Sequence, residues 1–318
     1  MTKNIKLFII VFTLTFLVGL TVNVSFEKMG DFFYWNELAS NPKLLTAQAN
    51  QLAFEENLRE LKPLRNGAIP ELELQAKSAI SLFLDNNGNE RALFQKNSDG
   101  KVPIASLTKL MTAKVVLENY NLSENIKISK EAIRQEENFG KLRVGDTLSV
   151  EELLYPLLME SSNDAAFALT NDYRDMTGYR FVEMMNQEAV NLGLNSTFFI
   201  NQSGLDSEET SRTNYSTAVD LAKLAKELLG DGLIWEILST PTINLYGQTL
   251  ESTNELLGKL SSIVGGKTGY TEKALGCFLL IVEAPKGRGY LINVVLGSPD
   301  RFGEMEKLIS WVKGAYYW

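Results

Sequence analysis

The sequence predicts an α+β protein in which strands from both ends of one domain form a single antiparallel sheet around a helical insert. Two apolar runs, 78–84 and 91–95, flank a turn rich in Asp, Asn and Gly and predict an early β-hairpin. Apolar residues at helical spacing dominate the middle of the chain, and strand-like runs return at 277–282 and 290–296. Because strands lie on both sides of the helical region, we expect them to meet in one sheet.

Helical spacing of apolar residues predicts four helices between the strands and one after the last strand. They are expected at 107–120, 150–173, 179–192, 217–229 and about 302–312. The folded domain is therefore expected to cover 76–318, with its helical insert at about 107–240.

The composition of residues 1–26 predicts a membrane anchor or signal segment. It carries no charge from Leu7 to Phe26, and a helix of that length would span about 30 Å, the hydrocarbon thickness of a bilayer. Lys3 and Lys6 precede the run, so the positive-inside rule places the remaining chain on the extracytoplasmic face. Bulky residues at 21–26 fit a signal-peptidase site poorly. We therefore expect an uncleaved single-pass helix in the cytoplasmic membrane, with a secreted protein as the alternative.

A stalk is predicted over 27–75, between this anchor and the folded domain. The segment is mixed in charge, and 47–62 shows helical spacing before Pro63, which should end the helix.

The composition excludes several kinds of active site. The 318 residues include no histidine, which rules out a Ser-His-Asp triad and a Cys-His pair. Cys277 is the single cysteine, so an intramolecular disulfide and a Cys-rich metal cluster are excluded. A net charge of −8 disfavours nucleic acid as a partner. Catalysis is left to Ser, Thr, Lys, Tyr and carboxylates, and we expect neither metal nor cofactor.

A Ser-x-x-Lys pair supplies the predicted nucleophile and base. In Ser106-Leu107-Thr108-Lys109 the amine lies one helical turn from the hydroxyl, within reach if burial and neighbouring cations keep the lysine neutral. Pro103 favours a helix start near Ser106, which would point the serine N–H toward a developing oxyanion. The same spacing recurs at four other serines, so spacing alone does not identify the site; they are Ser25, Ser40, Ser98 and Ser310.

Two further motifs follow in order along the chain. Ser161-Ser162-Asn163 offers a hydroxyl that can relay a proton and an amide that can hold a substrate backbone. Lys267-Thr268-Gly269, expected at a strand edge, offers a cation, a hydroxyl and a backbone that a peptide can approach closely.

Because the three motifs occur in this order along the chain, it resembles the serine D-alanyl-D-alanine carboxypeptidases, the low-molecular-mass penicillin-binding proteins of peptidase family S11. The resemblance runs from about residue 76 to the carboxyl end and implies a β-lactamase/transpeptidase-like fold. The blocks that carry it are 104–113, 162–165, 204–206 and 266–271.

The resemblance implies a role for each motif residue. Ser106 would attack the carbonyl between two D-alanines, with Lys109 as base and Ser161 and Lys267 relaying a proton to the leaving group. Asn163, Thr268 and Gly269 would bind the stem peptide, and the backbone N–H of Tyr270 would complete the oxyanion hole. Arg301 would help to bind the terminal carboxylate, unless it is a solvated surface residue. β-Lactams would be covalent inhibitors.

Three other functions stay open from the sequence. A D,D-endopeptidase that cuts peptide cross-links would use the same motifs. A class A β-lactamase would need a glutamate that activates the deacylating water, and Glu183 and Glu188 fit better on the solvated face of a helix. The third is a catalytically inactive module that binds the cell wall.

Overall fold

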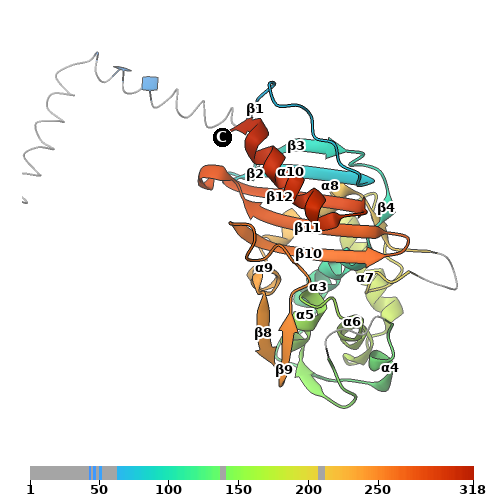
Figure 1. Cartoon of the computed structure of the whole chain (residues 1–318). Coiled ribbons are helices and arrows are strands. Elements are labelled where there is room, and N and C mark those ends of the chain that lie inside the picture. The colour runs from blue at the N-terminus through green and yellow to red at the C-terminus, as the bar shows by residue number, and fades with distance from the viewer. Residues whose placement is uncertain (1–42, 44–45, 48–49, 52–62, 137–140, 207–211) are drawn as a thin grey trace, which may run out of the picture. The chain divides into compact units, whose positions relative to one another are not determined.

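The computed structural model describes the chain from Pro63 onward with two short gaps, and Arg65–Trp318 forms one compact unit (Figure 1). The described residues are 43, 46–47, 50–51, 63–136, 141–206 and 212–318. The predicted anchor lies outside them, as does the predicted stalk helix apart from three helical residues, Ala47, Asn50 and Gln51. Within the described part of the chain, no helix is long and apolar enough to cross a membrane.

One five-stranded antiparallel sheet organises this unit, in the strand order β10-β11-β12-β2-β3 (Figure 1). The early hairpin comprises β2 (Ser78–Asp85) and β3 (Glu90–Lys96). The late strands are β10 (Ile263–Thr271), β11 (Leu275–Glu283) and β12 (Gly289–Ser298). Because β2 pairs with β12 along the whole length of β2, the two ends of the domain share one sheet, as the sequence predicts.

The remaining elements are helices and short strands. The helical elements are η1 (Ala105–Leu107), α3 (Thr108–Asn119), α4 (Lys130–Ile133), α5 (Val150–Leu158), α6 (Asn163–Phe167), the π-helical turn η2 (Ala168–Asp172), α7 (Gly178–Asn191), α8 (Ala218–Leu228), α9 (Gly232–Ser239), η3 (Pro285–Gly287) and α10 (Arg301–Ala315). The short strands are β1 (Leu64–Arg65), β4 (Val102–Pro103), β5 (Asn125–Lys127), β6 (Thr147–Ser149), β7 (Tyr215–Ser216), β8 (Thr242–Leu245), β9 (Gln248–Glu251) and β13 (Tyr316–Tyr317).

Side-chain alternation along the central strands builds a core on each face of the sheet. On β11, Phe278 and Leu280 point toward α10, where they join a cluster that includes Leu308. Leu279 and Ile281 point to the opposite face and join the larger core of the helical region. The sheet is therefore covered on both sides, which explains the nearly continuous apolar sequence of β11 and β12.

The predicted helix over 150–173 is wrong as a single element. A capping box at Ser149 and Glu152 starts α5. The helix ends at Leu158 because Ser161 adopts a left-handed backbone with φ +62°, which no helix can accommodate. The Ser162 hydroxyl then accepts a hydrogen bond from Ala165 N–H and starts α6. Apolar periodicity continues across this break, which is why the sequence pattern does not reveal it.

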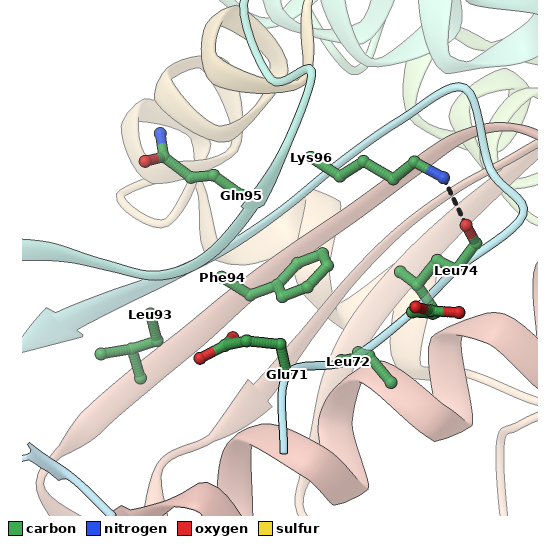
Figure 2. Close-up of a pocket in the computed structure, with 8 residues that line it drawn as sticks. Glu71, Leu72, Leu74, Leu93, Phe94, Gln95 and Lys96 are labelled. Atoms are coloured by element: carbon green, nitrogen blue, oxygen red, sulfur yellow. Dashed lines mark hydrogen bonds between the residues drawn. The ribbon is translucent and has the colours of Figure 1, made fainter. Parts of the chain in front are cut away.

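A groove of about 530 Å³ lies between the segment 71–74 and the edge strand β3 (Figure 2). Lys96 closes one end by donating a hydrogen bond to the Leu74 carbonyl. Since β3 and β10 form opposite edges of the sheet, this groove lies away from the Lys-Thr-Gly strand.

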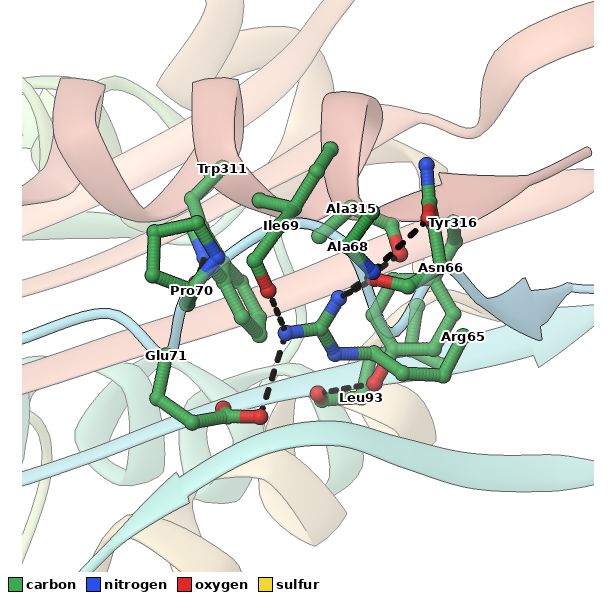
Figure 3. A network of polar contacts seen from close by, with 10 residues as sticks. All are labelled: Arg65, Asn66, Ala68, Ile69, Pro70, Glu71, Leu93, Trp311, Ala315 and Tyr316. Carbon is green, nitrogen blue, oxygen red and sulfur yellow. Dashed lines mark hydrogen bonds and ion pairs between the residues drawn. The ribbon is translucent and has the colours of Figure 1, made fainter.

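Arg65 fastens the start of the folded unit to its last helix (Figure 3). Its guanidinium donates to the Ala315 carbonyl at 3.3 Å and to the Ile69 carbonyl at 2.6 Å. The same group lies 4.8 Å from the centre of the Trp311 ring, a cation–π distance. Arg65 also pairs with Glu71, so one side chain joins residues from both ends of the domain.

Replacing Arg65 by alanine should reduce stability without changing the active site. Loss of the carbonyl bonds and the aromatic contact is expected to lower the free energy of unfolding by about 1–3 kcal/mol. Compared with Arg65→Ala, the Arg65→Lys variant should recover only part of the lost free energy of unfolding, because an ammonium lacks the planar fork of donors that a guanidinium has. Urea unfolding measures both, with Arg143→Ala at an exposed position as the control. Equal stability of the Arg65→Ala variant and the wild type would contradict this role.

Candidate active site

Ser106 and Lys109 meet where the turn η1 continues into α3. Lys109 Nζ lies 2.9 Å from Ser106 Oγ, and the lysine side chain is fully buried. The turn is held in place because Ile104 N–H donates to the Asn214 carbonyl at 3.2 Å. The sequence predicted that one helical turn would bring the two groups together, and the structure places them within hydrogen-bond distance.

Two more oxygen atoms surround the Lys109 amine. Nζ donates to Asn163 Oδ1 and to the Ser203 carbonyl, both at 2.8 Å. The Asn163 amide is itself oriented, since its Nδ2 donates to the Glu136 carbonyl at 2.8 Å. Neither Asn163 Oδ1 nor a backbone carbonyl can donate a hydrogen bond. A neutral amine that keeps its two N–H bonds on these acceptors therefore directs its lone pair at the Ser106 hydroxyl.

Sequence reasoning missed the turn that presents the Ser203 carbonyl. Asn201 Oδ1 accepts hydrogen bonds from Ser203 N–H at 3.2 Å and Gly204 N–H at 2.7 Å. Gly204 has φ +90°, and a Cβ there would lie 2.0 Å from the Ala105 carbonyl oxygen. Asn214 Nδ2 donates to the Asn201 carbonyl and to Thr108 Oγ1, both at 2.9 Å. The block 204–206 signalled this turn, but the functional group is a backbone carbonyl, which no residue identity marks.

Ser161 is held with its hydroxyl available. Its left-handed backbone, with φ +62°, turns the chain between α5 and α6, and α6 begins two residues later at Asn163. Ser161 Oγ is buried and has no hydrogen-bond partner among the described residues. Burying a polar atom without a partner costs free energy and therefore calls for an explanation, and a hydroxyl that is available for substrate or for proton transfer supplies one.

Lys267 and Thr268 lie on β10, at an edge of the sheet. Lys267 is fully buried, and its Nζ donates to the Thr268 carbonyl at 3.0 Å. Burial lowers the pKa of Lys267 well below its usual value of 10.5, and repulsion from Lys109 and Arg301 lowers it further. Thr268 Oγ1 lies 2.7 Å from Thr253 Oγ1, a contact that the sequence gave no reason to expect.

Gly269 lets β10 pack closely against η1, the turn that carries Ser106. A Cβ at this position would lie 3.0 Å from the Ser106 backbone nitrogen and 3.2 Å from the Ala105 side chain, so close approach requires glycine. Tyr270 follows with 56% of its surface exposed. The strand therefore passes beside the Ser106 N–H, where an oxyanion hole would form.

Arg301 joins this strand from the first position of α10. Its Nη1 donates to the Gly269 carbonyl at 3.0 Å, and its Nε is buried without a hydrogen-bond partner among the described residues. Burial lowers the pKa of the guanidinium. The backbone makes room for it, because a Cβ on Gly276 would come within 3.0 Å of the Arg301 Cβ. The structure thus places Arg301 partly buried beside β10, within hydrogen-bond distance of the Gly269 carbonyl.

An antiparallel sheet built from both ends of the domain and a serine hydrogen-bonded to a buried lysine are the features that the resemblance to the penicillin-binding peptidases implied. The chain belongs to the S11 peptidase family: the model described as D-alanyl-D-alanine carboxypeptidase matches residues 65–300.

Individual relatives agree with this assignment. D-alanyl-D-alanine carboxypeptidase DacF of Bacillus subtilis is 32% identical over 259 residues, which cover 77% of this chain and 64% of DacF. A D-alanyl-D-alanine endopeptidase of Pseudomonas aeruginosa is 32% identical over 254 residues, covering 76% of this chain and 79% of that protein. The chain thus spans just under two thirds of the length of DacF.

The fold is also that of solved relatives. Penicillin-binding protein D2 of Listeria monocytogenes, in its cefotaxime-bound form, superposes with a TM-score of 0.67 at 33% identity, covering 77% of this chain and 99% of that chain. The family and the transpeptidase-like α+β fold that the sequence suggested are confirmed.

Replacing Lys267 by methionine should make the folded protein more stable near neutral pH. Methionine fills a similar volume and removes the cost of a buried cation, so the melting temperature should rise by about 2 °C or more. Because the pKa of Lys267 is lowered in the folded state, the unfolded chain binds more protons between that value and 10.5. Wild-type stability therefore rises with pH in this window, and its deficit against Lys267→Met should shrink toward pH 10.5.

Thermal unfolding at several pH values tests this, with Lys259→Met as the control because Lys259 is exposed. A Lys267→Met variant less stable than the wild type at pH 7, or a stability difference independent of pH, would contradict the inferred cost of burying this cation.

Proposed function

We propose that this chain is a serine-type D-Ala-D-Ala carboxypeptidase that removes the terminal D-alanine of peptidoglycan stem peptides through an acyl-enzyme on Ser106. The observation that carries the proposal is the Lys109 amine, buried between two fixed acceptors and 2.9 Å from the Ser106 hydroxyl. In a protein without histidine, this amine is the base best placed to activate a serine. The family and the names of its relatives support D-Ala-D-Ala peptides as the substrate class.

Acylation follows from these positions. Neutral Lys109 takes the Ser106 proton as Oγ attacks the carbonyl between the two D-alanines, and the backbone N–H groups of Ser106 and Tyr270 stabilise the oxyanion. Ser161 then donates its proton to the leaving nitrogen and is reprotonated by Lys267. The C–N bond breaks and D-alanine departs. The lowered pKa of Lys267 suits it to give up that proton.

Deacylation returns each proton to its origin. Water attacks the acyl carbonyl and transfers a proton through Ser161 to Lys267, and Lys109 gives its proton back to Ser106 Oγ as the ester bond breaks. Every group is then in its starting state, so the cycle needs neither a metal nor a cofactor.

Substrate recognition is assigned to the groups around β10 and α6. Asn163 would hold the peptide backbone, and Gly269 would let the peptide lie close to the strand. The terminal carboxylate would bind Thr268 and Arg301, in a region where protonated Lys267 and Arg301 supply positive charge. β-Lactams, which carry a carboxylate next to a reactive carbonyl, would acylate Ser106; the Listeria relative binds cefotaxime and ampicillin.

A D,D-endopeptidase that cuts peptide cross-links is the second candidate. The supporting observation is the 32% identity to the Pseudomonas aeruginosa endopeptidase, as high as the identity to DacF. The two activities attack the same type of bond and differ in the group that leaves.

For its location we propose the extracytoplasmic face of a bacterial cytoplasmic membrane. The uncharged run 7–26 would anchor the chain, and the predicted stalk would lead to the compact unit that begins at Arg65 and contains the catalytic domain predicted over 76–318. This location gives the active site access to peptidoglycan, which lies outside the membrane.

Incubation of the full-length protein with pentapeptide monomers and with cross-linked dimers tests the activity. Free D-alanine from the pentapeptide supports a carboxypeptidase, whereas monomers released without free D-alanine would establish the endopeptidase instead. Ser106→Ala should abolish turnover. Ser310→Ala is the matched control, since Ser310 is an exposed serine with the same Ser-x-x-Lys spacing, and it should retain wild-type turnover.

A further inference from the structure

Thr253 lies next to the Lys-Thr-Gly strand but belongs to none of the three motifs. Its Oγ1 is 2.7 Å from the Oγ1 of Thr268, and either hydroxyl can be the donor. Thr268 is 4% exposed, so few other partners can reach its hydroxyl. Thr253 is therefore the side chain best placed to decide which way the Thr268 hydrogen points.

The backbone of Thr253 is fixed independently of its hydroxyl. Its N–H donates to the Met159 carbonyl at 3.0 Å, two residues before Ser161. Asn254, the next residue, is buried and accepts a hydrogen bond from Leu256 N–H at 3.1 Å through Oδ1. Thr253 thus bridges the segment that leads into Ser161 and strand β10, and removal of its hydroxyl leaves these backbone contacts in place.

In a hydrogen bond between two hydroxyls, one is the donor and the other is the acceptor. If Thr268 donates its hydrogen to Thr253, it offers only an acceptor to the substrate, and a carboxylate cannot use an acceptor. If Thr253 donates to Thr268, the Thr268 hydrogen is released for the carboxylate, and the two bonds polarise each other. A bound carboxylate therefore selects the second arrangement, in which the Thr253 hydroxyl donates to Thr268 Oγ1, holds its orientation and strengthens its bond to the carboxylate.

We infer that Thr253 is a positioning residue that orients the Thr268 hydroxyl toward the terminal carboxylate of the substrate. The inference rests on the proposed function, in which Thr268 binds that carboxylate. It makes position 253 a determinant of selectivity for substrates with a free carboxylate. Thr253 itself need not touch the substrate.

Two thioesters separate this role from a structural one. One is an N-acyl-D-alanyl thioester of thioglycolate, whose leaving group carries a carboxylate, and the other is its methyl ester. Both release a thiol, so turnover is measured in the same way. The enzymes are the wild type, Thr253→Val, which keeps the side-chain shape, and Thr253→Ser, which keeps the hydroxyl. Thr249→Val is the matched control, because its hydroxyl bonds to Asn244 on an exposed hairpin.

We expect Thr253→Val to lower kcat/KM for the free carboxylate about three- to tenfold, mainly through KM, and to change the methyl ester less than about twofold. Thr253→Ser and Thr249→Val should keep the wild-type preference. Equal losses on both thioesters, no loss on either, or the same loss in Thr253→Ser would overturn the inference. A wild type that turns over neither thioester would overturn the proposed function as well, so the two failures are distinguishable.

Discussion

The site depends on one constraint, the burial of the Lys109 amine among three oxygens. Two of them, Asn163 Oδ1 and the Ser203 carbonyl, can only accept hydrogen bonds, so a neutral amine has one direction left for its lone pair, toward Ser106. Each acceptor comes from a different part of the chain. The break between α5 and α6 delivers Asn163, and the turn at Gly204 delivers the carbonyl. The local irregularities of the fold are therefore what orients the base.

The same region buries basic side chains at the expense of stability. Lys267 is buried near Lys109 and Arg301, its amine donates a hydrogen bond to the Thr268 carbonyl, and its lowered pKa reflects the cost of burying a cation there. The Ser161 hydroxyl and Arg301 Nε are buried and have no hydrogen-bond partner among the residues that the structure describes. These unsatisfied groups share a location near β10 and α6, and an anionic peptide would satisfy several of them. A site that is strained when empty and complementary when occupied is typical of an enzyme whose binding energy orients its substrate.

The sequence predicted the architecture well where periodicity carries the information. The early hairpin, the late strands and the last helix lie within a few residues of their expected positions because burial on a sheet face or helix face leaves a repeating pattern. The break at Ser161 was missed because it depends on one left-handed residue within continuous apolar spacing. The Ser203 carbonyl and the Thr253 hydroxyl could not be predicted, since one is backbone and the other acts through a contact between distant segments.

Peptide mapping by mass spectrometry after incubation with a penicillin tests the central claim most directly. If Lys109 activates Ser106, the intact β-lactam mass is added to the peptide that contains Ser106, and Lys109→Ala removes this adduct while the variant still folds. An adduct on another serine, or an undiminished adduct on Ser106 in Lys109→Ala, would contradict the assignment of nucleophile and base.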